Sequence, residues 1–100
     1  MYLFVNSQIV TVVIYLQGES MNRLKELRED KDLYQKDIAK ILNMSQTGYS
    51  QYETEINDIP TKILKQLAEF YNTSIDYLLY ETDERKPYPK SVMKEEKAKK

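Results

Sequence analysis

The chain has 100 residues, 15 basic and 16 acidic side chains, and a formal net charge of −1. This length allows one small domain. There is no Cys and no His, so disulfides, thiolate chemistry and the side chain best suited to proton transfer and metal binding are excluded, and we expect no enzyme, no cofactor and no metal site.

Residues 1–20 are rich in β-branched and aromatic side chains, and residues 9–16 have the composition of a strand. They lack the basic start and cleavage site of a signal peptide, and polar residues 6–8 leave too short an apolar run for a membrane span. Two interpretations remain: an added edge strand or dimerisation arm, or a translated leader before a natural start at Met21. The leader is favoured, because residues 17–19 can be encoded by a purine-rich ribosome-binding sequence just before the Met21 codon.

The first helix is expected over residues 23–31, with Asn22 as its N-cap and Leu24 and Leu27 on one face. Leu33 is expected to pack beneath the turn that follows. A second helix is predicted over residues 35–42. It is expected to bury Ile38, Ala39 and Leu42, with Ile41 beside them.

Residues 35–54 have the pattern of a helix-turn-helix. Two helices that cross over a turn of about three or four residues must approach closely at one point, where Ala39 supplies a small side chain. Asn43 can adopt the left-handed conformation that ends a helix, and Ser45 is a good N-cap for the next helix, residues 46–53.

In this third helix, Tyr49 and Tyr52 share one face, and the other sides carry polar, uncharged residues that suit contacts with base edges. Gly48 inside the helix costs about 1 kcal/mol relative to Ala, which indicates a close-packing or DNA-approach constraint. The alternative is an ordinary helical hairpin with solvated Gln and Ser side chains.

A fourth helix is expected to start at Pro60 and Thr61 and to end at Asn72. Its core positions at helical spacing are Ile63, Leu64, Leu67, Ala68 and Tyr71. Ser74 is expected to cap a fifth helix over residues 75–80, with Leu78 and Leu79 turned inward.

Residues 81–100 carry 7 basic and 5 acidic side chains, two prolines and few apolar residues. This composition predicts a largely disordered, flexible tail. Its role is either to keep the chain soluble or to extend basic charge along a DNA backbone.

Residues 22–79 resemble the Cro and phage-repressor type of helix-turn-helix DNA-binding domain, the XRE-like family. The resemblance rests on RLKELRED, DLYQKDIAKILNMSQTGYSQYE, NDIP and TKILKQLAEFYNTSIDYLL, at residues 23–30, 32–53, 57–60 and 61–79. Three residues depart from the family pattern. Tyr34 replaces the usual cap of the second helix, which Asp37 partly offsets through the helix dipole; Asn43 replaces the commoner Gly; and Glu55 stands where Gly is common.

The resemblance implies an all-α, compact five-helix bundle of the lambda-repressor type over residues 21–80. It also implies a cytoplasmic transcriptional regulator of phage, mobile-element or bacterial origin that binds double-stranded DNA, expected to be a repressor acting as a homodimer on a palindromic operator. Base contacts are expected from Gln46, Thr47, Ser50 and Gln51, phosphate contacts from Gln35, Asn57 and Lys62, and a structural pair from Arg28 and Glu53.

Net charge supports an alternative function. Residues 21–80 contain 8 Lys or Arg and 10 Asp or Glu, a net charge of −2, and residues 46–53 contain no Lys or Arg. Because DNA affinity comes largely from phosphate neutralisation, a protein-interaction module on the same fold, such as an antitoxin-like or antirepressor partner, is the alternative.

Overall fold

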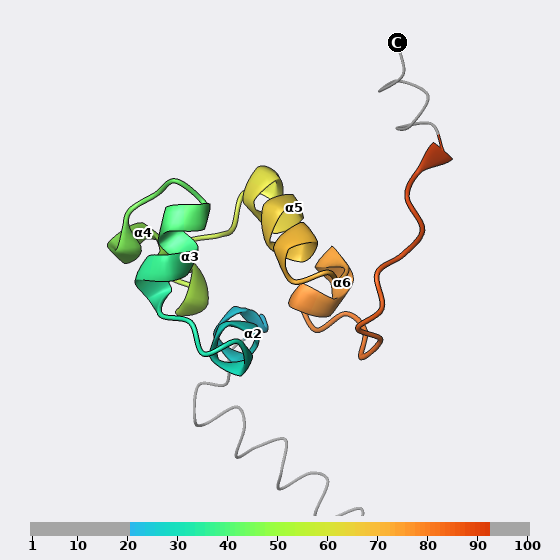
Figure 1. Ribbon diagram of the computed structural model, residues 1–100, viewed down its shortest axis with the longest axis horizontal. Helices are drawn as coiled ribbons and strands as arrows, with labels where there is room; N and C mark the ends of the chain where they lie inside the picture. Colours follow the sequence, from blue (N-terminus) through green and yellow to red (C-terminus); the bar gives the residue numbers. More distant parts are fainter. Residues whose placement is uncertain (1–20, 93–100) are drawn as a thin grey trace, which may run out of the picture.

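The computed structural model describes residues 21–92, and the expectations for residues 1–20 and 93–100 lie outside the described residues. Five helices follow one another: α2 (Leu24–Asp30), α3 (Gln35–Ile41), α4 (Gln46–Glu53), α5 (Thr61–Phe70) and α6 (Ile75–Leu78). In Figure 1, α3 and α4 form one side of the bundle, α5 and α6 form the other, and α2 lies between them at one end. Residues 21–92 contain no strand, so the all-α prediction is confirmed, and none of their helices has the length and apolar character to span a membrane.

The core draws on all five helices. Seven large residues are at most 2% exposed, namely Leu24, Leu27, Ile38, Tyr49, Leu67, Tyr71 and Leu78. Burial of this much apolar surface is the main favourable contribution to folding. The hydroxyl oxygens of Tyr49 and Tyr71 are buried and have no hydrogen-bond partner within the described part of the chain.

The predicted burial of Ile38, Ala39 and Leu42 is confirmed, whereas Ile41, expected beside them, is 48% exposed. The core stripe of α3 follows Ile38, Ala39 and Leu42. At 3.6 residues per turn, Ile41 lies about a third of a turn away from the centre of that stripe. It lines a shallow surface hollow beside Phe70 of α5 instead.

The helix starts agree with the predicted caps in chemistry, and differ slightly in position. The Ser45 and Ser74 hydroxyls accept the N–H groups of Gly48 and Tyr77, each at 3.0 Å. The first helix begins at Leu24, one residue later than predicted, and its N–H donates to the Asn22 side chain at 3.1 Å. These bonds satisfy donors that have no partner inside a helix.

The start of α3 lacks a Ser, Thr or Asn cap, as its sequence indicates. The Asp37 carboxylate, three residues into the segment, instead accepts the Tyr34 N–H at 2.7 Å. This is the second half of a capping box, and it places a negative charge at the positive end of the helix.

Each of the five helices is followed, two residues after its last residue, by a residue with φ between 53° and 65°. These left-handed residues are Asp32, Asn43, Glu55, Asn72 and Tyr80. A left-handed residue at this position lets the chain turn back and bond the last carbonyls of the helix. The left-handed conformation predicted for Asn43 is therefore confirmed.

Arg23 connects the start of α2 to α6, at the C-terminal end of the domain sequence. Its main-chain N–H donates to the Leu78 carbonyl and its Nε to the Tyr77 carbonyl, both at 2.7 Å. The guanidinium carbon lies 4.0 Å and 4.1 Å from the ring centroids of Tyr77 and Tyr80. Arg23 is 8% exposed, so these contacts enclose a charged side chain between two aromatic rings.

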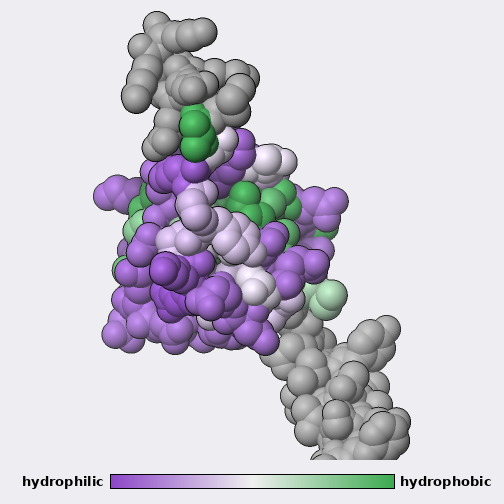
Figure 2. All heavy atoms as spheres, turned by 90° about the vertical axis from the view of Figure 1, so that its right-hand side faces the viewer, coloured by the Kyte–Doolittle hydropathy of each residue, from purple (hydrophilic) through white to green (hydrophobic). Residues whose placement is uncertain are grey.

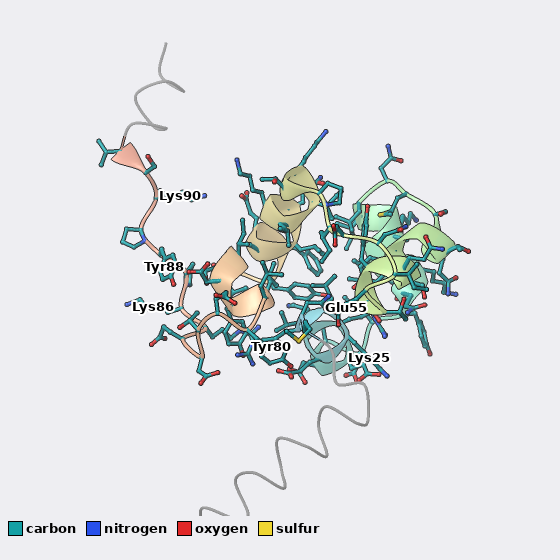
Figure 3. All side chains as sticks on the ribbon, turned by 180° about the vertical axis from the view of Figure 1, so that it is seen from behind. Lys25, Glu55, Tyr80, Lys86, Tyr88 and Lys90 are labelled. Carbon is teal, nitrogen blue, oxygen red and sulfur yellow. The ribbon has the colours of Figure 1, made fainter. Side chains whose placement is uncertain are left out.

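Residues 81–92 lie outside the five helices, yet they contact the domain. The Thr73 hydroxyl donates to the Arg85 carbonyl at 2.6 Å, and the Tyr88 hydroxyl donates to Asp76 at 3.0 Å. Figure 3 shows Lys86, Tyr88 and Lys90 along this segment beside α6. On the face that includes this segment, hydrophobic atoms form a small patch within a mostly hydrophilic surface (Figure 2). Residues 81–92 of the tail are thus irregular in conformation but hydrogen-bonded to the bundle.

Candidate nucleic-acid interface

The interface is built on α3 and α4, which pack closely at the turn between them. Ala39, which is 2% exposed, lies on the buried side of α3, as a helix-turn-helix requires. A Cβ added at Gly48 would lie 3.0 Å from Met44 Cε and 3.1 Å from Ser45 Oγ. The Met44 methyl group ends a flexible side chain and can shift, whereas Ser45 Oγ is held by its bond to the Gly48 N–H at 3.0 Å, so a side chain at position 48 would crowd the cap.

Five of the predicted contact residues gather around one hollow beside α4. This surface, here called the α4 hollow, has a volume of about 430 Å³. Its lining residues are Gln35, Gln46, Thr47, Ser50, Gln51, Thr54 and Ile56. The lining combines amides, hydroxyls and one apolar side chain and carries no charge, so it can offer hydrogen bonds of both polarities.

A buried ion pair holds α4 against α2. Arg28 donates from Nε to Glu53 Oε2 at 2.7 Å and from Nη2 to Oε1 at 3.1 Å, in the two-pronged geometry that suits a guanidinium and a carboxylate. Arg28 also donates to the Leu33 carbonyl at 2.9 Å. The two residues are 8% and 6% exposed, which agrees with the structural role predicted for them.

The pKa values of the pair follow from these contacts. Burial favours the neutral carboxyl of Glu53, but hydrogen bonds to its charged form outweigh burial, and the pKa of Glu53 lies below its ordinary value. The hydrogen bond to Glu53 raises the pKa of Arg28. Both side chains are therefore held in their charged forms.

Gln35 connects this buried pair to the surface. Its amide Nε2 donates to Glu53 Oε1 at 3.1 Å, and the half-buried side chain also lines the α4 hollow. One amide hydrogen is thus used inside the protein. The other N–H and the carbonyl oxygen of this side chain remain available to a ligand.

The other two predicted phosphate contacts are placed differently. Asn57 lies in the loop after α4, where its Nδ2 donates to Gln51 Oε1 at 2.8 Å. Lys62 is exposed near the start of α5 and does not line the α4 hollow. The structure therefore brings Asn57 to a predicted base-contacting residue and leaves Lys62 apart from the group.

Two lysines that the sequence analysis did not select lie beside Gln46. Lys36 and Lys40, four residues apart on α3, line a second hollow of about 340 Å³ together with Asn43 and Gln46. Both are exposed, and neither has an ion-pair partner among residues 21–92. Their spacing on the face opposite Ile38 and Leu42 is the sequence signal that identifies them.

A family model described as helix-turn-helix matches residues 24–78, which is more than half of the chain. The chain belongs to this helix-turn-helix family. The resemblance found in the sequence is thereby confirmed, and α3 and α4 are the two helices of the motif.

The helix-turn-helix chain has relatives in Bacillus subtilis (strain 168). The HTH-type transcriptional regulator ImmR is 42% identical over 57 residues, which cover 57% of this chain and 45% of ImmR. The uncharacterized HTH-type transcriptional regulator YobD is 35% identical over 65 residues, which cover 65% of this chain and 58% of YobD. The chain spans about half the length of these relatives, and no solved structure matches it significantly.

Both relatives are named as transcriptional regulators, which confirms the prediction that this helix-turn-helix protein is not an enzyme. In a helix-turn-helix of this class, the second helix lies in the major groove with its N-terminal residues at the base edges. In this chain the second helix is α4, and its first residues are Gln46 and Thr47.

Proposed function

We propose that the protein is a transcriptional regulator that binds double-stranded DNA in a sequence-specific manner, and that it acts as a repressor on a palindromic operator as a homodimer. The α4 hollow is the observation that carries this proposal. It gathers Gln46 and Thr47, which are exposed, and Ser50 and Gln51, which are half-buried, on one uncharged face of the second motif helix. The relatives named as transcriptional regulators support the same function.

Base contacts would come from α4. Gln46, exposed at the start of the helix, suits a bidentate contact to adenine N6 and N7, and the Thr47 methyl group suits a thymine methyl. Ser50 and Gln51 lie one turn further along and would meet neighbouring base edges or phosphates.

Phosphate contacts would come from the rim of this face. Gln35 at the start of α3, Asn57 in the loop after α4 and Lys62 in α5 are the contacts proposed from the sequence. To these we add Lys36 and Lys40, since they supply positive charge next to Gln46. Local charge of this kind is needed, because residues 21–80 as a whole have a net charge of −2.

A second copy would complete the site. One such helix contacts only a few base pairs, and two helices related by a two-fold axis would contact half-sites about 34–36 Å apart. The surfaces that we propose for pairing are the loop after α4 and the region of α6; the sequence also suggested the N-terminal segment, which lies outside the described residues. Such a regulator would act in the cytoplasm of a bacterial cell, where the DNA is.

Selection from random duplex DNA tests the function directly. The full chain is expected to enrich an inverted repeat, and its affinity for that repeat should fall as the salt concentration rises. Replacing Gln46 and Gln51 with Ala should lower specific affinity without changing the helical circular-dichroism signal. Gln66→Ala, an exposed Gln-to-Ala change on α5 outside the α4 hollow, is the matched control.

The net charge of −2 and the lack of Lys and Arg in α4 favour one second function, a protein-interaction module of the antitoxin-like or antirepressor type. A folded chain that enriches no duplex would contradict DNA binding and support this alternative. Copurification with a protein partner that contacts Gln46 or Thr47 would then be the expected result.

A further inference from the structure

The end of α4 differs from the ends of the other four helices. After α2, α3, α5 and α6, the residue following the left-handed position donates its N–H to the carbonyl five residues earlier: Leu33 to Arg28, Met44 to Ala39, Thr73 to Ala68 and Glu81 to Asp76, at 2.8–3.1 Å. This is the Schellman arrangement. After α4, the corresponding carbonyl, that of Gln51, accepts the N–H of Asn57, one residue later, at 3.2 Å.

The extra residue has two consequences. Ile56 is the additional residue within the turn that the Asn57 N–H closes, and it is 70% exposed at the edge of the α4 hollow. Asn57 takes the place next to Gln51 and bonds it twice, through the main chain at 3.2 Å and from its Nδ2 to Gln51 Oε1 at 2.8 Å. Asn57, a predicted phosphate contact, is thus hydrogen-bonded to Gln51, a predicted base contact.

The side-chain bond orients the Gln51 amide. With Oε1 held toward Asn57, the amide nitrogen and its two N–H donors are turned the other way. A bidentate contact with adenine needs the amide oxygen to accept from N6. In this arrangement that oxygen points toward Asn57 and uses one of its two lone pairs there, whereas both N–H donors point away from Asn57 and are available to acceptors.

We propose that Asn57 positions the Gln51 amide so that it donates to DNA, and that Gln51 thereby selects a base edge that presents acceptors. Guanine offers O6 and N7 in the major groove, and thymine offers O4. The inference rests on the proposed DNA-binding function and adds to it a positioning residue and a base class.

The test compares base preferences in selections with the wild-type chain, Gln51→Ala, Asn57→Ala and Asn57→Asp. Gln51→Ala identifies the operator position that depends on Gln51, where the wild type should prefer guanine or thymine by about five-fold or more. Asn57→Ala should reduce that preference toward none and leave the positions contacted by Gln46 and Thr47 unchanged.

Asn57→Asp gives the sharper result. A carboxylate only accepts hydrogen bonds, so it should draw the Gln51 N–H donors toward itself and turn Oε1 to the DNA. The preferred base should then change to adenine or cytosine, which present donors. The double change Asn57→Asp with Asp58→Asn keeps the loop charge constant and should show the same change of preference.

Each other outcome contradicts the inference. A wild-type preference for adenine or cytosine at the Gln51-dependent position would overturn it, as would an unchanged preference in Asn57→Ala. Equal loss at every operator position in Asn57→Ala would show a general role of the loop and overturn it too. A folded wild-type chain that enriches no duplex would contradict the DNA-binding function itself, and the positioning role with it.

Discussion

Arg28 and Glu53 illustrate how single residues prepare the interface without touching DNA. The pair is buried, doubly hydrogen-bonded and further bonded by Gln35. It joins α2 to the last residue of α4, so the orientation of α4 depends on it. Loss of DNA binding after a change at either residue would therefore reflect the fold as much as the interface.

Removing one partner should be strongly destabilising. Arg28→Ala or Glu53→Ala leaves a buried charge without its counterion, and the free energy of unfolding should fall by about 3–5 kcal/mol. Replacing both residues with Met should restore most of the stability, because no charge then remains buried. Urea unfolding measures all three, and the exposed Lys25→Ala on the same helix is the control.

The pKa of Glu53 predicts the response to acid. This pKa lies below the ordinary value of 4.5, because the hydrogen bonds to the carboxylate outweigh the effect of burial. A lowered folded-state pKa adds stability above the unfolded-state value, and this stability is lost as the pH falls through the folded-state value. Urea midpoints should therefore decline as the pH drops below 4.5. A decline of equal size in the Arg28→Met, Glu53→Met variant would contradict this cause.

At the scale of the elements, α3 would supply the positive charge of the proposed interface and α4 its hydrogen-bonding groups. Lys36 and Lys40 stand on α3, and the uncharged α4 hollow lies beside them. If the lysines contact phosphates, each Lys→Gln change should weaken binding to specific and random duplexes alike. Each should also reduce the slope of log K against log salt concentration by about 0.9.

Gln46→Ala should behave in the opposite way, since it should lower the preference for the operator and leave the slope unchanged. Lys65→Gln, an exposed lysine on α5, is the matched control for charge. Equal slopes for Lys65→Gln and the α3 variants would contradict phosphate contact by Lys36 and Lys40.

Local patterns in the sequence were sufficient for most of the elements. The bounds of α4 and its Ser45 cap were predicted from the sequence, because cap chemistry acts over a few residues. The Arg28–Glu53 pair joins residues far apart in the chain, and only the family resemblance implied it. The exposure of Ile41 was missed, since it depends on how α3 faces its neighbours. The bond between Asn57 and Gln51 depends on one extra residue in a turn, which helical periodicity does not register.

At the scale of the whole molecule, Arg23 joins the first described helix to the last one and to the segment that follows it. It reaches from the start of α2 to the rings of Tyr77 and Tyr80, and its Nη2 donates to the Thr82 carbonyl and to Asp83, both at 3.0 Å. The contacts of residues 82 and 83 explain why the segment after α6 stays attached to the domain. None of these partners is near Arg23 in the sequence, so sequence patterns did not indicate them.

Arg23→Ala should lower the free energy of unfolding by at least about 2 kcal/mol, because it removes charge-assisted hydrogen bonds and two cation–π contacts. Arg23→Lys should recover only part of this loss, since an ammonium group cannot stack and donate in the same geometry. Thermal unfolding measures both variants. Full recovery by Lys would show that charge alone is sufficient.

Tyr49 and Tyr71 have a consequence for how the core can be observed. Burial raises the pKa of both phenols above the ordinary value of 10.0. In alkali that ionises a tyrosine in water, these two side chains stay neutral until the core opens to solvent. The chain has no tryptophan, so the phenolate absorbance of Tyr49 and Tyr71 is an intrinsic optical signal of core opening that needs no attached label. The hydrogen bond to Asp76 also raises the pKa of the exposed Tyr88, and Tyr88→Phe removes that contribution from the signal.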